Sequence, residues 1–331
     1  MRRPLSPLSR QSGLTLVELM IAAALGLLLL AALGYLYAGN RQAFRTHDSV
    51  ARLQENGRYA MEVLGQDLRM VGYLGCGALG EVPVANTAVV AAPVAVPAPA
   101  NVLGGTEGAG GAADTLTLMR VDGRGAVLTA TMANPADPVP IPASPRQHAA
   151  GTYFLIADCL NADLFRNSVV VDPGDTTIVH AAGTHNTHDD LSKAYGADAL
   201  VFPFEALAYS IANNPAGNPA LYRAVNGTAQ EVVENVKDMQ IVYGVDTNND
   251  GAVDVYRRAD QVADWSRVLA VRVSLLLRSP ETNVATGPPA VFWDPDNDGT
   301  NDFNPATDAD AQARRLLYVY TSTIGLRNRL R

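Results

Sequence analysis

The sequence lacks several residues and motifs that would point to common functions. Only two of its 331 residues are cysteine, 6% are aromatic, and the net charge is -8. Two cysteines so far apart match no zinc or redox motif. No basic patch is dominant, so we expect no nucleic-acid partner. The G-x-S-x-G, H-E-x-x-H, Walker A and Rossmann glycine patterns are also missing, and nothing in the sequence indicates an enzyme.

Proline is absent from residues 14–74, and residues 14–37 carry a single charge, that of Glu18. As a helix, the apolar run 14–37 is about 36 Å long, enough to cross a hydrocarbon core of about 30 Å. The short leader 1–13 contains Arg2, Arg3 and Arg10 and should stay in the cytoplasm. We therefore predict a single membrane span, with everything after residue 37 on the far side.

The order of signals around this span is unusual. A secretory signal has its small-residue cleavage site after the apolar region, whereas here Gly13 stands before it. A carboxylate such as Glu18 inside an apolar helix is costly and is usually functional. The alternative is a plain signal anchor with an incidental glutamate.

The stretch from Gly13 through Leu14 and Thr15 to Glu18 resembles the class III signal of type IV prepilins. The resemblance implies that a prepilin peptidase cuts between Gly13 and Leu14 and methylates the new amino terminus. Prepilins more often have Phe where this chain has Leu14. The resemblance also implies that Glu18 pairs with the terminal amine of a neighbouring subunit during assembly, since an unpaired charge there would be severely penalised.

The pattern changes in residues 38–75, which contain both apolar and charged positions. Apolar and small residues recur there at spacings of three and four, which predicts an amphipathic continuation of the same helix. Asp67 falls among the charged residues that we place on other faces, and Gly72, Gly75 and Gly77 are the expected stop signals of the helix. The predicted buried stripe consists of Leu53, Gly57, Ala60, Leu64, Leu68 and Val71.

The remainder, residues 76–331, should form a β-rich head outside the cytoplasm. Residues 81–113 are rich in proline, glycine and alanine and predict a surface loop. The fold class is α+β: a long N-terminal helix packed on a mainly antiparallel sheet. A short helix or an irregular edge is expected at 230–236. Strands are predicted at 114–121, 153–157, 168–171, 207–212, 221–225, 240–245, 268–277 and 316–321.

The C-terminal half resembles the PilW group of minor pilins at residues 234–240, 243–246, 271–279 and 326–330. The resemblance implies a structural protein that helps to initiate or cap a type IV pilus. Its partners would be the prepilin peptidase, other minor pilins, the major pilin and a tip adhesin. The protein would start as a single-pass inner-membrane protein with a periplasmic head and then move to the pilus at the cell surface. Two alternatives are a minor pseudopilin of type II secretion and a pilin-like module that binds a surface.

Cys76 and Cys159 would both lie outside the cytoplasm, where disulfides form and persist. We expect them to be linked; the alternative is two buried free thiols.

Two acidic loops have the spacing of oxygen ligands for Ca²⁺, with a glycine at the bend. Their candidate ligands are Asp246, Asn248, Asp250 and Asp254 in the first loop and Asp294, Asp296, Asp298 and Asp302 in the second. Both lack the glutamate of an EF-hand at position twelve, where Arg257 and Pro305 stand. Calcium is the cofactor that these loops suggest. The alternative is a pair of turns rich in Asp, Asn and Gly that need no metal.

Overall fold

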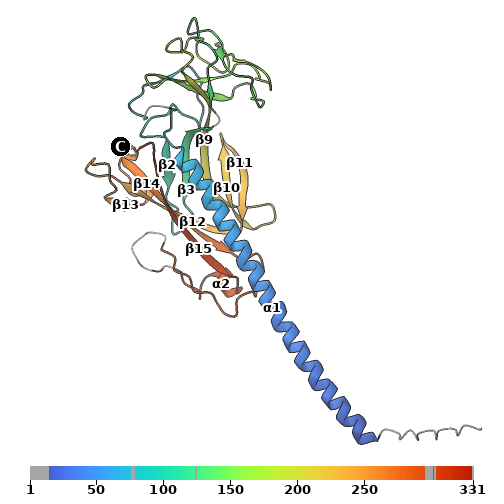
Figure 1. Ribbon diagram of the computed structural model, residues 1–331. Helices are drawn as coiled ribbons and strands as arrows, with labels where there is room; N and C mark the ends of the chain where they lie inside the picture. The colour runs from blue at the N-terminus through green and yellow to red at the C-terminus, as the bar shows by residue number, and fades with distance from the viewer. Residues whose placement is uncertain (1–14, 76–78, 124, 295–300, 302, 330–331) are drawn as a thin grey trace, which may run out of the picture.

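The structure is a computed structural model that describes residues 15–75, 79–123, 125–294, 301 and 303–329. A long helix, α1 (Leu16–Arg69), extends from a β-rich head like a stalk (Figure 1). The helix has 54 residues. It ends six residues before the predicted limit of 75 and close to the expected stop Gly72, which has a φ of +73°, a left-handed conformation that closes a helix.

Only the C-terminal half of α1 packs against the head. Its buried positions repeat every three or four residues, so the predicted stripe is confirmed, Val71 included. Burying one leucine of this stripe contributes roughly 1.5–3 kcal/mol. Asp67, expected on a solvent face, is instead buried because two arginines of the sheet reach it.

The head contains two main sheets. In the part of the chain that the structure describes, the first has nine strands, with the main order β1-β7-β6-β9-β10-β11, and the second has the order β13-β12-β14-β15. All pairs are antiparallel except β1 with β7. The first sheet comprises β1 (Val84–Asn86), β2 (Leu103–Thr106), β3 (Thr115–Val121), β4 (Ala126–Val127), β6 (Tyr153–Ala157), β7 (Ala162–Arg166), β9 (Leu200–Asn213), β10 (Pro219–Val225) and β11 (Thr228–Glu234).

The second sheet comprises β12 (Val236–Val245), β13 (Val255–Arg257), β14 (Val268–Arg278) and β15 (Leu317–Gly325), and a small ribbon pairs β5 (Val139–Pro140) with β8 (Thr177–Ile178). A short helix, α2 (Ala309–Gln312), lies between β14 and β15. The α+β architecture predicted from the sequence is thus confirmed.

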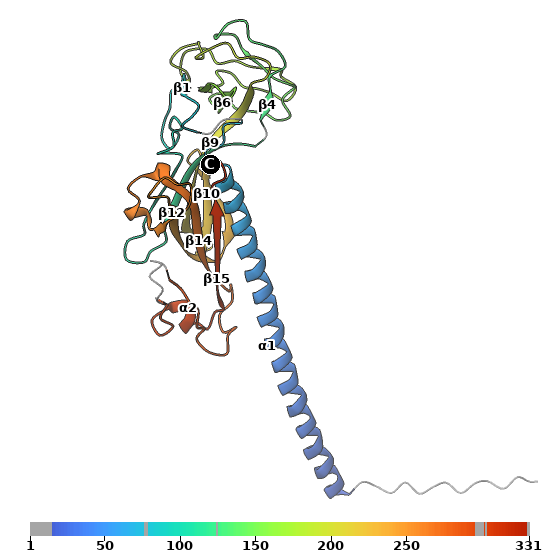
Figure 2. The ribbon, with the colours of Figure 1, turned by 60° about the vertical axis from the view of Figure 1, so that its left-hand side comes forward.

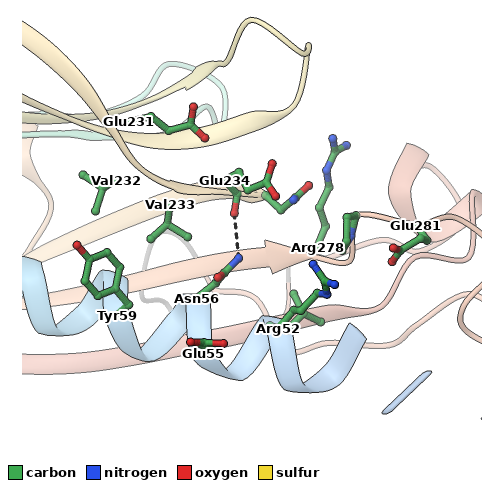
Figure 3. A pocket seen from close by; sticks show the side chains of 13 residues that line it. Arg52, Glu55, Asn56, Tyr59, Glu231, Val232, Val233, Glu234, Arg278 and Glu281 are labelled. Atoms are coloured by element: carbon green, nitrogen blue, oxygen red, sulfur yellow. Dashed lines mark hydrogen bonds between the residues drawn. The ribbon is translucent and has the colours of Figure 1, made fainter. Parts of the chain in front are cut away.

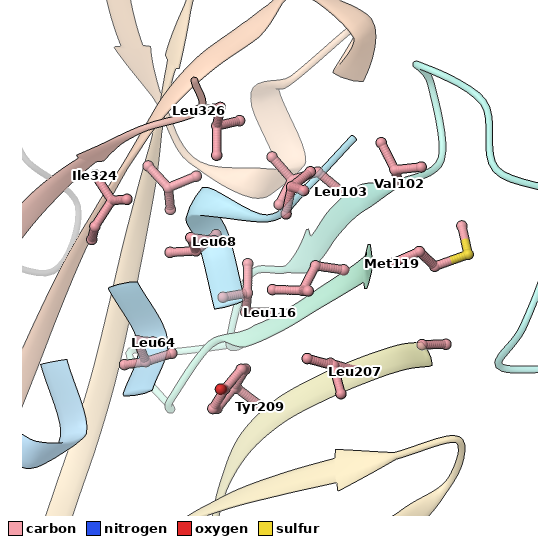
Figure 4. Packing of buried hydrophobic residues seen from close by; sticks show 14 of the residues in the cluster. Leu64, Leu68, Val102, Leu103, Leu116, Met119, Leu207, Tyr209, Ile324 and Leu326 are labelled. Carbon is pink, nitrogen blue, oxygen red and sulfur yellow. The ribbon is translucent and has the colours of Figure 1, made fainter. Parts of the chain in front are cut away.

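The long strand β9 joins two lobes. Its first residues pair with β4 and β6, and its later residues pair with β3 and β10. The lobe around β6, the distal lobe, lies at the end of the head away from the stalk (Figure 2). It has its own core, in which Phe154, Phe165 and Tyr195 are buried. The other lobe packs Leu64 and Leu68 of α1 among Leu103, Leu116 and Tyr209 (Figure 4).

Two local predictions were wrong, and a third was confirmed in one of its two alternatives. Residues 168–171 form no strand, and only Val171 makes an isolated bridge, to His148. Residues 230–234 lie in β11, an edge strand whose pairing with β10 shifts in register, so the predicted irregular edge is confirmed and the helix is not. The loop 81–113 contains β1 and β2, because their backbones pair with the more apolar strands β7 and β3.

Candidate assembly site

The first described turn of α1 carries the predicted assembly residue. Glu18 and Thr15 form a capping box: Thr15 Oγ1 accepts the backbone N–H of Glu18 at 3.2 Å, and Glu18 Oε2 accepts the backbone N–H of Thr15 at 2.9 Å. The Thr15 hydroxyl also donates to Glu18 Oε2 at 2.9 Å, and no other residue of the described chain bonds to this carboxylate. The processing residues Gly13 and Leu14 lie outside the described residues.

The N-terminal half of α1 is apolar and bare. Its large side chains are exposed from Leu16, at 74%, to Phe44, at 73%. In the described chain α1 is the one helix long and apolar enough to cross a membrane, and none of its most apolar stretch is buried by the head. A solvated face this apolar needs lipid or other subunits to cover it.

The other half of α1 is held by a buried ion cluster around Asp67. Arg223 Nε donates to Asp67 Oδ2 at 2.7 Å, and Arg120 Nε lies 3.3 Å from Asp67 Oδ1. The hydroxyl of Tyr209 also donates to Asp67. Burial beside this carboxylate raises the pKa of Tyr209, which therefore stays protonated and keeps its hydrogen bond. The cluster ties the helix to β3, β9 and β10.

Two further contacts hold the same half of the helix. The ring of Tyr320 lies over Gly57 so closely that a Cβ at Gly57 would be 2.1 Å from Tyr320 Cε2. Asn328 Nδ2 donates to the carbonyls of Arg69 and Val71, at 3.1 and 3.0 Å, and so caps the end of α1. The next residue, Arg329, donates to three backbone carbonyls, and burial lowers its pKa to about 10.

In the first acidic loop, Asn248 contacts two of the other three predicted ligands, and Asp246 bonds to backbone N–H groups. Asn248 Nδ2 donates to Asp250 Oδ2 at 3.0 Å and lies 3.5 Å from Asp254 Oδ1. Asp246 Oδ2 accepts the N–H of Gly251 at 2.8 Å, and Asp254 Oδ2 accepts the N–H of Thr247 at 2.7 Å. Hydrogen bonds from the Thr247 hydroxyl and from the N–H groups of Thr247 and Asn248 lower the pKa of Asp254. The loop is a turn braced by its own carboxylates, and its calcium site stays a prediction.

In the second loop Asp294 is described, whereas Asp296, Asp298 and Asp302 lie outside the described residues. Cys159 is disulfide-bonded, at the turn between β6 and β7. Cys76, its predicted partner, lies outside the described residues, so that pairing remains a prediction. Across the described ranges, no group of three or more His, Cys, Asp or Glu side chains is placed to hold a metal ion.

Sequence reasoning missed the residues that hold the helix to the head. In the sequence, Asp67 resembles the other charges of the amphipathic helix. The sequence also indicates no role for Arg120 and Arg223, which lie in predicted strands. One signal was available: Asp67 lies between the buried positions Leu64 and Leu68, so its side chain starts near the buried stripe.

Comparison with known proteins agrees with this geometry at both ends of the chain. The prokaryotic N-terminal methylation motif matches residues 8–34, across the predicted cleavage site and most of the predicted span. The family described as Type IV Pilus-assembly protein W matches residues 208–328, from within β9 to the Asn328 cap. The middle of the chain, including most of the distal lobe, lies outside both matches.

The search of curated proteins gave no match. Among solved structures, a type IV-like pilin from Thermus thermophilus is similar at 12% identity, with 85% of this chain and 98% of that chain covered and a TM-score of 0.36. The two matches show a domain of the PilW family of minor pilins, structural proteins of type IV pilus assembly, in the same chain as a prepilin N-methylation motif.

Proposed function

We propose that this minor pilin is cut between Gly13 and Leu14, methylated on Leu14, and then helps to initiate or cap the filament. Before assembly, residues 14–37 would span the inner membrane, with the head in the periplasm. After assembly the head would be displayed on the pilus at the cell surface. The partners would be the other minor pilins, the major pilin and a tip adhesin.

The observation that carries this proposal is the contrast within one helix. The N-terminal half of α1 is apolar and uncovered by its own chain, while the C-terminal half is buried in the head. Such a helix suits a subunit that moves from lipid to a bundle of neighbouring helices, because both surroundings cover the same apolar side chains.

Glu18 fits a role in that move. Among the residues that the structure describes, its partners come from Thr15 alone, and both groups belong to the first turn. After cleavage the cationic amine of Leu14 in an adjacent subunit would be a stronger partner than a neutral hydroxyl, because charge-assisted hydrogen bonds are roughly twice as strong. The pair would form only when two subunits are in the correct register.

The test is the intact mass of the protein from cells with and without the prepilin peptidase. We expect loss of residues 1–13 and the gain of one methyl group only when the peptidase is present. A Gly13→Ala control substitution should leave the chain full-length in both strains. A chain that stays uncut when the peptidase is present would refute the proposal.

A further inference from the structure

A groove runs between α1 and the edge of the first sheet, where the stalk joins the head. It has a volume of about 600 Å³ and lies against Arg52, Asn56 and Tyr59 on one side and β11 on the other. Figure 3 shows Asn56 and Tyr59 of α1 facing Val232, Val233 and Glu234 across it. A single weak hydrogen bond crosses the gap, from Asn56 Nδ2 to the carbonyl of Glu234 at 3.5 Å.

The charges that line this groove are unbalanced. Four glutamates line it, and in the described chain none makes an ion pair: Glu55, Glu231, Glu234 and Glu281. The two lining arginines are already paired elsewhere, Arg52 with Asp48 at 3.0 Å and Arg278 with Asp310 at 2.8 Å. The lining carries four negative and two positive charges, so the groove has a net negative potential, although Arg52 and Arg315 also attract Glu281.

A buried group adds an independent sign of a ligand. Asn235 lines the groove, is 2% exposed, and its side-chain oxygen accepts no hydrogen bond within the described chain. A buried acceptor without a partner costs about 1–3 kcal/mol, so a donor from outside would be favoured there. Asn235 also turns the chain from β11 into β12 with a φ of +62°, which fixes its position.

The groove is continuous with a second hollow along the same helix. That hollow, of about 620 Å³, shares Pro280 and Glu281 with the groove and extends to Phe44 and Arg45. Together they follow α1 from Phe44 to Tyr59, about 22 Å at 1.5 Å per residue. This length suits a helix better than a single ion, and it leads directly into the uncovered apolar half of α1.

We infer that this glutamate-lined groove holds an arginine- or lysine-bearing stretch of the helix of an adjacent pilin subunit. The inference rests on the proposed function. Arginine and lysine side chains supply donors for the four carboxylates and for the Asn235 oxygen. Their aliphatic stems pack on Val232, Val233 and the Tyr59 ring. The chain's own α1 carries such a stretch, with exposed Arg41 and Arg45 four residues apart and without ion pairs in the described chain.

The first test is photo-cross-linking in cells, with benzoylphenylalanine in place of Tyr59 and, separately, in place of Val232. The control position is Val127, which is 51% exposed on the distal lobe. We expect cross-links from Tyr59 and Val232 to a basic stretch in the helix of another protein that carries a prepilin motif, and none to that stretch from Val127. Cross-links only to lipid, or only to proteins without that motif, would overturn the inference.

The second test compares two charge reversals on one helix. Glu55 lines the groove, whereas Glu62 lies outside it and bonds to Gln66, and both are exposed. We expect Glu55→Lys to lower the Tyr59 cross-link at least about fivefold, since repulsion replaces attraction at a contact that sets partner choice. Glu62→Lys should leave it unchanged. Equal losses in both variants would overturn the inference.

The same strains separate this inference from the proposed function. The intact mass of each variant reports whether residues 1–13 were removed, and that result depends on the N-terminus alone. Correct processing together with absent cross-links would refute the groove and leave the pilin function in place.

Discussion

Two carboxylates on the same helix have opposite surroundings. Glu18 stands in an exposed apolar half and, within the described ranges, bonds only to Thr15. Asp67 is buried in the head with Arg120, Arg223 and Tyr209 around it. Because the helix is continuous between them, the difference comes from what covers each half rather than from local conformation.

The comparison teaches where each half obtains its stability. The half around Asp67 is covered by its own chain, so its burial contributes to the free energy of folding of the head. The half around Glu18 is left for lipid or other subunits to cover, so its burial contributes to the free energy of membrane insertion or assembly. Substitutions at the two carboxylates should therefore affect different measurements.

The largest effect is expected for Glu18→Ala. Removing one partner of a pair in apolar surroundings costs about 3–5 kcal/mol, which corresponds to more than a hundredfold in equilibrium. We expect the yield of sheared pili to fall by about that factor, while the unfolding midpoint of the head in detergent stays the same. Normal piliation with this variant would contradict the assembly role of Glu18.

The converse substitution, Asp67→Ala, should destabilise the head. It leaves Arg120 and Arg223 partly buried with fewer partners, at an expected loss of about 3–5 kcal/mol. The control is Glu62→Ala on the exposed face of the same helix, which should change stability by no more than about 0.5 kcal/mol. Chemical unfolding of both variants in detergent measures the difference, and similar midpoints would show that the cluster does not hold the helix.

A third carboxylate differs from both, because it is largely buried and burial is the main influence on it. Burial raises the pKa of Asp238 to about 6, although hydrogen bonds from Gln240 and the N–H of Met239 oppose this. Protonation therefore favours the folded state, and the contribution of this group to stability is lost as the pH rises from about 4 to about 6. The head should lose at most about 3 kcal/mol over that range from this residue.

Asp238→Asn removes the titrating group and tests this directly. Unfolding measured at pH 4 and at pH 7 should show a smaller change for the variant than for the natural chain. An identical pH dependence in the two proteins would place the pKa of Asp238 near its ordinary value.

The sequence predicted the regular parts of this fold because their signals are local. The stripe of Leu53, Leu64 and Leu68 has helical spacing, and the run that became β6 is a short apolar segment between turn residues. The strands β1 and β2 were not predicted because their residues, including Gly104 and Gly105, have little strand preference. They are strands because β7 and β3 offer them backbone partners.

The site was predictable to the same extent. The prepilin signal around Glu18 is contiguous, so it could be recognised from the sequence. The ion cluster of Asp67, Arg120 and Arg223 joins residues that are far apart in the chain, and no spacing rule connects them. The groove beside Asn235 depends on how α1 lies against β11, which only the tertiary structure provides.

The smallest effect is expected from calcium at the first acidic loop. In the structure Asp246 and Asp254 are satisfied by backbone N–H groups, so a metal would add bonds to a turn that is already formed. Extracellular calcium modules bind with dissociation constants of about 10⁻⁴–10⁻³ M. At 1 mM calcium such a site would stabilise the head by about 0.4–1.4 kcal/mol.

Thermal unfolding with 1 mM calcium and then with excess chelator measures this effect. We expect a rise of a few degrees or less that the chelator reverses, because a small free-energy change moves the midpoint of a large domain little. Asp250→Ala should abolish the rise, because it removes one of the predicted ligands. The turn formed by Asp246 and Asp254 should remain, because the side chain of Asp250 is exposed and its bonds in the described chain stay within the loop. A rise that persists in this variant would move the metal to the loop of Asp294, and no rise in either protein would favour turns that work without metal.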